Sequence, residues 1–151
     1  MAKTDSINLL KVEKIIERYG YPGKSMVGTP TNTAAFLVIQ HSPKIPKYFP
    51  IIEQAGKNKE IPFTDVAMMQ DRLLTEARKP QIYGTQLQGK SIVDKHTGKT
   101  RQIIYVLPIE NAREVNKRRK QAGFQTTVEE NARRFGIEYR LYTYEEIDKL
   151  N

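Results

Sequence analysis

Residues 81–107 read QIYGTQLQGKSIVDKHTGKTRQIIYVL, and here the hydrophobic period of the chain changes from helical to strand-like. The strand-like segments are residues 81–87, 91–93 and 102–107. Residues 94–98 separate the last two segments and end in a glycine, which is typical of a hairpin turn. We therefore expect a small antiparallel β-meander over about residues 81–107.

Outside this stretch, apolar residues recur at helical spacing, and glycine or proline stands where helices would end. The predicted helices cover residues 5–19, 32–42, 47–55, 64–78, 111–122, 127–135 and 144–150. Residues 32–42 could also form a buried strand, and we favour a helix because Ala34 and Ala35 have high helix propensity. The sequence predicts an α+β fold, a mainly α-helical single domain over residues 1–151 with the meander inserted before the C-terminal helices.

Two of the predicted helices open with a pattern that satisfies free backbone groups at a helix start. Thr127 with Glu130, and Thr143 with Glu146, match the capping box, in which each side chain bonds the backbone of the other residue. These two pairs therefore mark the starts of the last two helices.

The composition bounds the kind of protein. The chain has 151 residues and no cysteine, which excludes disulfides, zinc–thiolate sites, iron–sulfur clusters and cysteine nucleophiles. It has no apolar run of the roughly 18–20 residues that a membrane span requires, so we expect no membrane partner. The N-terminus lacks the apolar segment of a signal peptide, which predicts a cytoplasmic protein. A mature exported domain would show the same pattern.

The charge is unevenly distributed. The chain carries 25 Lys and Arg against 17 Asp and Glu, a formal net charge of +8. Most of the excess lies in residues 78–101 and 111–140, whereas residues 1–77 are nearly neutral. This excess indicates an anionic partner, which could be a nucleic acid, a phosphorylated metabolite or an acidic polymer.

Two segments of the first half carry candidate catalytic residues. His41 ends an apolar helix, where partial burial would bring its pKa into the physiological range, although it could equally be a structural histidine bonded to a backbone carbonyl. Asp71 and Arg72 lie beside the apolar stripe of residues 64–78, where a buried acid needs a partner. The structural alternative is an ion pair between Asp71 and an arginine of residues 113–119.

Neutral polar residues follow at the start of the meander. Gln81, Tyr83, Thr85 and Gln86 supply hydrogen-bond donors and acceptors around Gly84. A glycine within a strand often marks the close approach of a ligand or of another backbone, although it can also mark a simple bulge.

The basic run of residues 113–120 is the fourth candidate. Arg118 and Arg119 in this run suit a phosphate or a carboxylate, and a solvated basic helix end is the structural alternative. The nucleotide-binding, hydrolase and zinc-protease motifs are missing, and the chain has two histidines. We therefore predict no metal site and no cofactor.

These residues occur in an order that resembles a known bacterial family of small domains of unknown function. The motifs that carry the resemblance are Tyr19-Gly20-Tyr21-Pro22, Gln40-His41, Asp71-Arg72, Tyr83-Gly84-Thr85-Gln86, Pro108-Ile109 and Asn116-x-Arg118-Arg119 with Gly123. They span about residues 10–125, and Tyr21 stands where the family usually has tryptophan. The resemblance implies a shared fold and a common polar site with His41, Asp71, Arg72, Tyr83 and Gln86, but it carries no known activity.

Three functions fit these observations. The first is an enzyme or small-ligand-binding domain acting on a phosphorylated or carboxylated substrate by hydrolysis or group transfer. Its expected residues are His41 and Asp71 as the catalytic pair, Arg72, Arg118 and Arg119 for the anionic group, and Gln81, Tyr83, Thr85 and Gln86 for hydrogen bonds.

The second function is binding of nucleic acid or another polyanion by one continuous face made of the basic hairpin 88–101 and the helix 113–120. The third is that of a protein-interaction domain in a bacterial defence or toxin system. The sequence leaves the choice among the three open, and it leaves the oligomeric state open as well.

Overall fold

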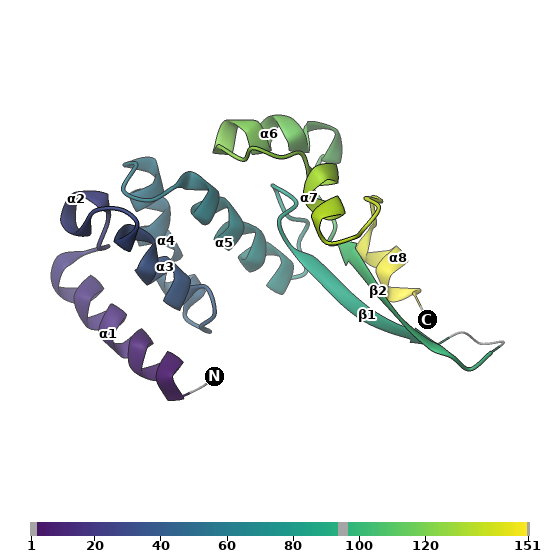
Figure 1. The fold of residues 1–151 in the computed structure, drawn as a ribbon, viewed down its shortest axis with the longest axis horizontal. Helices are drawn as coiled ribbons and strands as arrows, with labels where there is room; N and C mark the ends of the chain where they lie inside the picture. Colours follow the sequence, from purple (N-terminus) through teal and green to yellow (C-terminus); the bar gives the residue numbers. More distant parts are fainter. Residues whose placement is uncertain (1–2, 94–96, 151) are drawn as a thin grey trace. The chain divides into compact units, whose positions relative to one another are not determined.

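The structure is a computed structural model, and it describes residues 3–93 and 97–150. Within this part of the chain it contains eight α-helices, two short 3-10 helices and one two-stranded antiparallel sheet (Figure 1). The chain divides into two compact units, unit 1 (Met1–Met69) and unit 2 (Gln70–Asn151), and the boundary lies within helix α5 (Phe63–Glu76). The predicted α+β class with a mainly helical chain is confirmed, whereas the assignment of residues 1–151 to a single domain stays a prediction.

Unit 1 is built entirely from helices. They are α1 (Lys3–Tyr19), α2 (Lys24–Val27), η1 (Thr31–Thr33), α3 (Ala34–Ile39), α4 (Ile45–Lys57) and the first half of α5. Phe36, Ile39 and Ile52 are almost fully buried in its core. Gly56 allows α4 and α5 to approach closely, because a Cβ atom at this position would lie 2.4 Å from Cγ2 of Val66.

A buried acid joins α1 to α4. The carboxylate of Glu13, a residue that is 7% exposed, accepts hydrogen bonds from the Lys44 Nζ at 2.7 Å and from the Tyr48 hydroxyl at 2.8 Å. These bonds, that from Lys44 above all, hold the pKa of Glu13 below its ordinary value and outweigh the effect of burial. The ionised side chain therefore stabilises the packing of unit 1.

Unit 2 combines a hairpin with short helices. Its elements are the second half of α5, β1 (Leu87–Val93), β2 (Thr100–Val106), η2 (Ala112–Glu114), α6 (Val115–Ala122), α7 (Val128–Arg134) and α8 (Tyr144–Asp148). The two strands are antiparallel, with Leu87 opposite Val106 and Val93 opposite Thr100. Its core contains Val106, Ile109, Val115, Val128 and Ala132.

The sheet differs in detail from the expected meander. It has two strands, and the segment before β1 forms a single parallel bridge between Gln81 and Ile109 and then a loop. Residues 94–96 of the expected turn lie outside the described residues. The loop replaces a third strand because its backbone groups bond to side chains of other elements.

The helix starts agree with the capping patterns. Thr127 and Thr143 each accept a hydrogen bond from the backbone of the glutamate three residues later, and that glutamate bonds back to the threonine N–H.

Within the described residues, no helix combines the length and the apolar character needed to cross a membrane.

Candidate functional site

The carboxylate of Asp71 is the centre of a polar network inside unit 2. Asp71 is 0% exposed. Its Oδ1 atom accepts hydrogen bonds from the backbone N–H groups of Ile82 at 2.7 Å and Tyr83 at 3.0 Å. Its Oδ2 atom accepts from both the N–H, at 3.0 Å, and the hydroxyl, at 2.9 Å, of Thr85. One side chain therefore binds three backbone amides of the loop 82–86.

Two arginines of α6 bind the carbonyl groups of the same loop. The Nε of Arg118 donates to the carbonyl of Ile82 at 2.9 Å, and Nη1 of Arg119 donates to that of Tyr83 at 2.9 Å. The backbone donors of the loop thus face an acid, and its backbone acceptors face two cations. The sequence also allowed an ion pair between Asp71 and an arginine of residues 113–119. Within the described part of the chain, Asp71 forms no ion pair.

Burial dominates the electrostatics of this network. It raises the pKa of the Asp71 carboxyl, against the hydrogen bonds from Tyr83, Thr85 and Ile82. It also lowers the pKa of the Arg119 guanidinium, against the attraction of the Asp71 charge. Buried charged groups are poor sources of stability because their desolvation offsets their attraction. The network therefore serves chiefly to hold one geometry of the loop.

The side chain of Gln81 supports the loop from the other end. Gln81 is 0% exposed, and its amide nitrogen donates to the carbonyls of Gln86 at 3.0 Å and Leu107 at 2.8 Å. Its amide oxygen accepts from the backbone N–H of Gln86 at 2.8 Å. The amide thus replaces the main-chain partner that a third strand would have supplied.

Gly84 presses the middle of the loop onto the core of unit 2. Its φ is +69°, a conformation that residues with a side chain rarely adopt. A Cβ atom here would lie 2.7 Å from Cγ2 of Val128 and 2.8 Å from Cδ1 of Ile109. Glycine is therefore required both by the backbone angle and by the available space.

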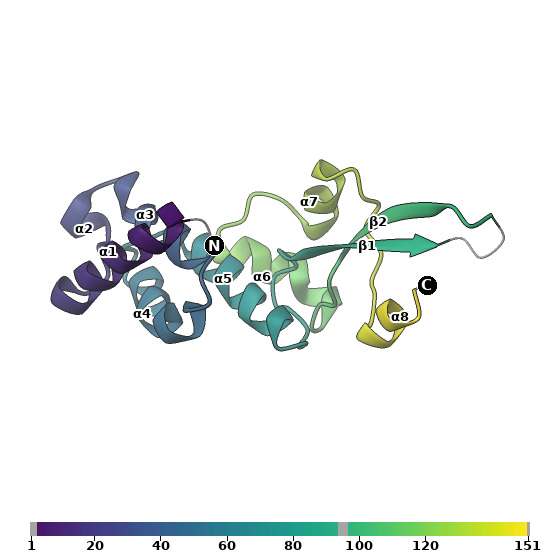
Figure 2. The ribbon, with the colours of Figure 1, turned by 90° about the horizontal axis from the view of Figure 1, so that it is seen from below.

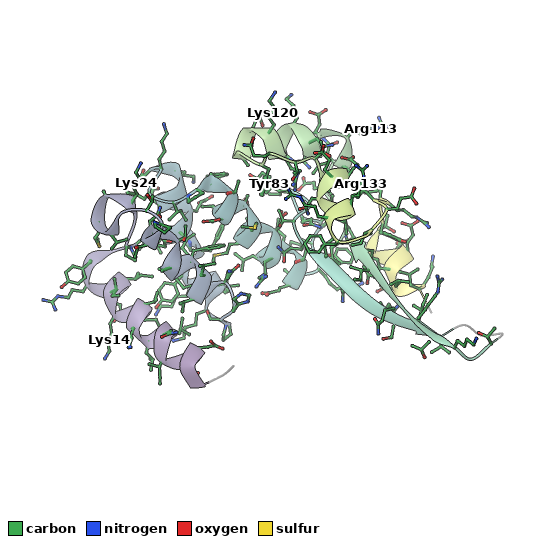
Figure 3. All side chains as sticks on the ribbon, viewed as in Figure 1. Lys14, Lys24, Tyr83, Arg113, Lys120 and Arg133 are labelled. Carbon is green, nitrogen blue, oxygen red and sulfur yellow. The ribbon has the colours of Figure 1, made fainter. Side chains whose placement is uncertain are left out.

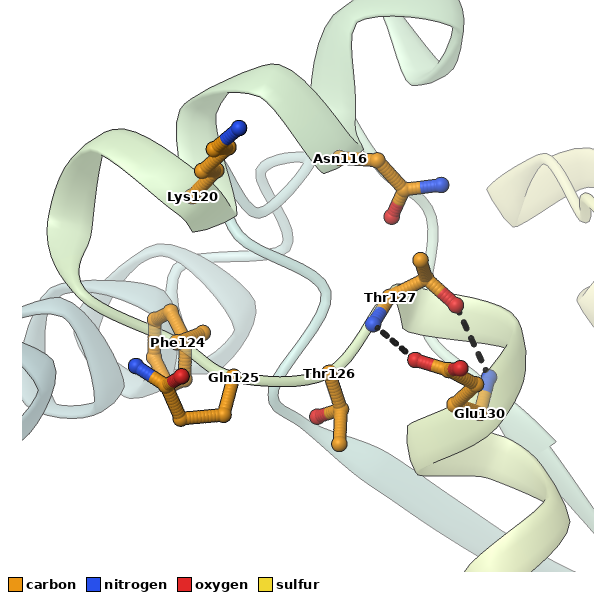
Figure 4. A pocket seen from close by; sticks show the side chains of 7 residues that line it. All are labelled: Asn116, Lys120, Phe124, Gln125, Thr126, Thr127 and Glu130. Carbon is orange, nitrogen blue, oxygen red and sulfur yellow. Dashed lines mark hydrogen bonds between the residues drawn. The ribbon is translucent and has the colours of Figure 1, made fainter.

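A pocket of about 600 Å³ lies beside this network, between α6 and the start of α7 (Figure 4). Its lining residues are Asn116, Lys120, Phe124, Gln125, Thr126, Thr127 and Glu130. We call it the Phe124 pocket. The ring of Phe124 lies 6.2 Å from that of Tyr83, and the guanidinium carbon of Arg119 lies 4.5 Å from the Phe124 ring centre. The loop network therefore also fixes one wall of the pocket.

The two charged groups of the Phe124 pocket differ in whether they are already bound to other groups of the protein. Lys120 is exposed and forms no ion pair with any residue that the structure describes. Glu130 is held in the capping box, where its carboxylate accepts from the N–H of Thr127 at 2.8 Å (Figure 4). The pocket thus offers an available cation and a carboxylate that is already bound.

Most of the predicted site residues come together in unit 2. They are Asp71, Gln81, Tyr83, Thr85, Gln86, Arg118 and Arg119, and Arg72 follows Asp71 on α5. Lys120 belongs to the basic run 113–120 that was a candidate for anion binding, whereas Phe124 was not expected in the site. An aromatic residue directly after Gly123, at the end of a basic helix, was the available signal.

His41 belongs to unit 1 and is exposed, so the expectation of partial burial was wrong. The turn after α3 places its ring at the surface instead of in the core. It lines a small pocket of about 210 Å³ together with Asp5, Asn8, Leu37 and Val38. The expected pairing of His41 with Asp71 in acid–base chemistry stays a prediction.

The two basic segments of unit 2 do not form the expected continuous face. Helix α6 and the far end of the β1–β2 hairpin lie at opposite ends of the unit in both views (Figures 1 and 2). Arg113 projects from η2 and Lys120 from α6, whereas Arg133 projects from α7 (Figure 3). Within the described residues, no group of three or more His, Asp or Glu side chains could hold a metal ion.

Comparison with known proteins gives a family and no activity. No curated protein and no solved structure matches the chain. One family model matches residues 1–142, which is nearly the whole chain and includes both the loop 82–86 and the Phe124 pocket. The predicted membership in a family of small domains of unknown function is confirmed. The chain belongs to the family of unknown function DUF6624.

Proposed function

We propose that unit 2 binds a small molecule with one acidic group and a planar ring in the Phe124 pocket. The observation that carries this proposal is the position of Phe124 beside an exposed lysine and against a buried arginine. Arg119 is 2% exposed, and its guanidinium donates hydrogen bonds to Tyr83 and Thr126. The aromatic wall is therefore preorganised before a ligand arrives.

Preorganisation is the reason to assign the polar network to binding. A wall whose side chains are already fixed loses little conformational entropy when it meets a ligand. Binding sites work best when surrounding hydrogen bonds lock the contact residues. The network of Asp71, Gln81 and Arg119 does this for the loop that carries Tyr83, and Tyr83 in turn contacts Phe124.

The chemistry of the pocket selects the ligand class. The ammonium group of Lys120 would bind a carboxylate or phosphate, and the exposed part of the Phe124 ring would stack with a planar group. The bound carboxylate of Glu130 disfavours a second acidic group on that side of the pocket. A single acidic group next to a ring therefore fits better than a polyanion does.

Titration of the protein with benzoate and with phenyl phosphate, followed by NMR of the backbone amides, tests the proposal. We expect amide shifts that centre on residues 116–130 and an affinity that falls about tenfold in Lys120→Ala, the loss of one charge-assisted hydrogen bond. Lys117→Ala removes the same charge from another exposed position of the same helix, and it should leave the affinity nearly unchanged. Equal weakening by both substitutions, or shifts that centre elsewhere, would refute the proposal.

Phe124→Leu separates stacking from charge. Leucine keeps an apolar side chain against Arg119 and removes the aromatic face. Benzoate binding should weaken in this variant, while acetate, which has no ring, should bind as weakly as it does to the wild type. If the substitution changes the affinities for benzoate and acetate by the same factor, Phe124 does not stack with the ring of the ligand.

A further inference from the structure

A second cavity of unit 2, of about 350 Å³, lies between the hairpin and α8, away from the Phe124 pocket. Two cations line it, Arg78 from the turn after α5 and Lys90 from β1. Tyr105 from β2 and Tyr144 from α8 supply aromatic walls. The cavity thus combines positive charge with tyrosine side chains in one partly open hollow.

The carboxylate of Asp148 in α8 lies at one of these cations. Its Oδ2 atom is 2.6 Å from Nη2 of Arg78. The ammonium group of Lys90 attracts the same carboxylate, although it donates its hydrogen bond to the carbonyl of Ile147 at 3.2 Å. An acid of the chain itself therefore sits where the two positive charges converge.

Tyr105 adds a hydrogen-bonding group that the protein leaves unused. It is 2% exposed and lines the cavity, with its ring 5.4 Å from that of Tyr142. Its hydroxyl forms no hydrogen bond with any residue in the described ranges. The hydroxyl is not one of the buried, unpartnered polar atoms of the described residues, so it is accessible from the cavity and can bond to a ligand there.

The backbone at Arg78 is also unusual. Arg78 has a φ of +54° in the turn after α5, and the N–H of Lys79 closes the helix by bonding to the carbonyl of Leu74 at 2.8 Å. Glycine is the preferred residue at such a helix end, because a side chain strains this conformation. A guanidinium group is held here despite that strain, stacked 4.9 Å above the ring of Tyr144.

We propose that this cavity is a second ligand site, which binds the phosphate or carboxylate group of a small molecule through Arg78, Lys90 and the Tyr105 hydroxyl. In the free protein the carboxylate of Asp148 occupies the position of that group. Arg78 and Asp148 are 61% and 58% exposed, and ion pairs this open to water are weak and readily exchanged. An external oxyanion can therefore replace Asp148 without unfolding the unit.

Removal of the internal competitor is the first test, with inorganic phosphate and acetate as separate probes of the two oxyanion classes. Asp148→Asn should bind the preferred probe about fivefold more tightly than the wild type, as expected when a tethered competitor is lost. Glu145→Gln makes the same charge change on the same helix, where the side chain does not line the cavity. It should change the affinity less than twofold. Equal effects of both substitutions would show a general charge effect and overturn the proposal.

The cavity residues are tested by matched losses of binding. Lys90→Ala should weaken binding of the probe about tenfold. Lys99→Ala removes the same charge just before β2 of the same hairpin, and it should leave the affinity unchanged. Tyr105→Phe removes only a hydroxyl that has no protein partner, so the fold should be unaffected while binding weakens severalfold. If phosphate and acetate bind Tyr105→Phe as they bind the wild type, or if Lys99→Ala weakens them as much as Lys90→Ala does, the assigned site is wrong.

Discussion

Replacing Asp71 with alanine should release the loop that its carboxylate holds. The substitution leaves the backbone amides of Ile82, Tyr83 and Thr85 without an acceptor in the interior of unit 2. An unsatisfied buried donor costs about 1–3 kcal/mol, and water entering the vacated space would recover part of that cost. We expect a loss of about 4 kcal/mol in the free energy of unfolding, which is the cost of three unsatisfied donors less the part that water recovers.

Asparagine at the same position should be milder. Its amide oxygen can keep the bonds to Ile82 and Tyr83, and its NH₂ group then faces the N–H of Thr85, so one donor stays unsatisfied. We expect a loss of about 2 kcal/mol. The loss is limited because burial already raises the pKa of the Asp71 carboxyl, which means that the ionised group itself is poorly solvated.

Urea unfolding gives the size of the loss, and amide hydrogen exchange gives its place. Exchange at Ile82, Tyr83 and Thr85 should accelerate far more than exchange at the core strand residue Val106. Asp65→Ala is the matched control, because Asp65 lies on the same helix and carries the same charge. Burial raises the pKa of its carboxyl, as it does for Asp71. If Asp71→Ala loses no more than about 1 kcal/mol, as expected for Asp65→Ala, and the three amides stay protected, the carboxylate does not hold the loop.

Three further substitutions test other parts of the structure. Gly84→Ala should destabilise unit 2 by about 3 kcal/mol, from the positive φ and the overlap with Val128, and an unchanged urea midpoint would contradict this. Glu13→Gln should cost about 2 kcal/mol at neutral pH. Because the folded pKa of Glu13 lies below its unfolded value near 4.5, this stability is present above that value and is lost as the pH falls through the folded pKa. The two proteins should therefore converge in acid, and a difference that persists there would refute the ionised contact. His41→Ala should change the free energy of unfolding by less than about 0.5 kcal/mol, since the side chain is exposed, and a larger loss in urea unfolding would show a structural role for the imidazole.

The helices followed from local information that the sequence contains. The apolar spacing of residues 5–19 and 64–78 predicted α1 and α5, and the Thr127 and Thr143 capping boxes predicted the starts of α7 and α8. These signals are reliable because the interacting groups are within four residues of one another, so the helix itself brings them together.

Only part of the candidate site could be predicted from the sequence. From the sequence, Asp71 was expected to act in a catalytic pair with His41, and Gln81 and Arg119 were expected to bind a substrate. The structure shows that they contact the loop instead, and that the residues left facing a pocket include Phe124 and Lys120. Polarity alone does not distinguish a side chain that binds a ligand from one that binds the backbone.

The amino-acid sequence by itself determined the helical character of this protein, the presence of a small antiparallel sheet before the C-terminal helices and the family to which the chain belongs. Only the tertiary structure decided that residues 82–86 form a loop and not a strand. The donors and acceptors of this loop are satisfied by Asp71 on α5 and by Arg118 and Arg119 on α6, and Asp71 lies 11 residues from Ile82 and 14 from Thr85. Hydrogen bonds over such separations form only after the elements have packed, so no local pattern can reveal them.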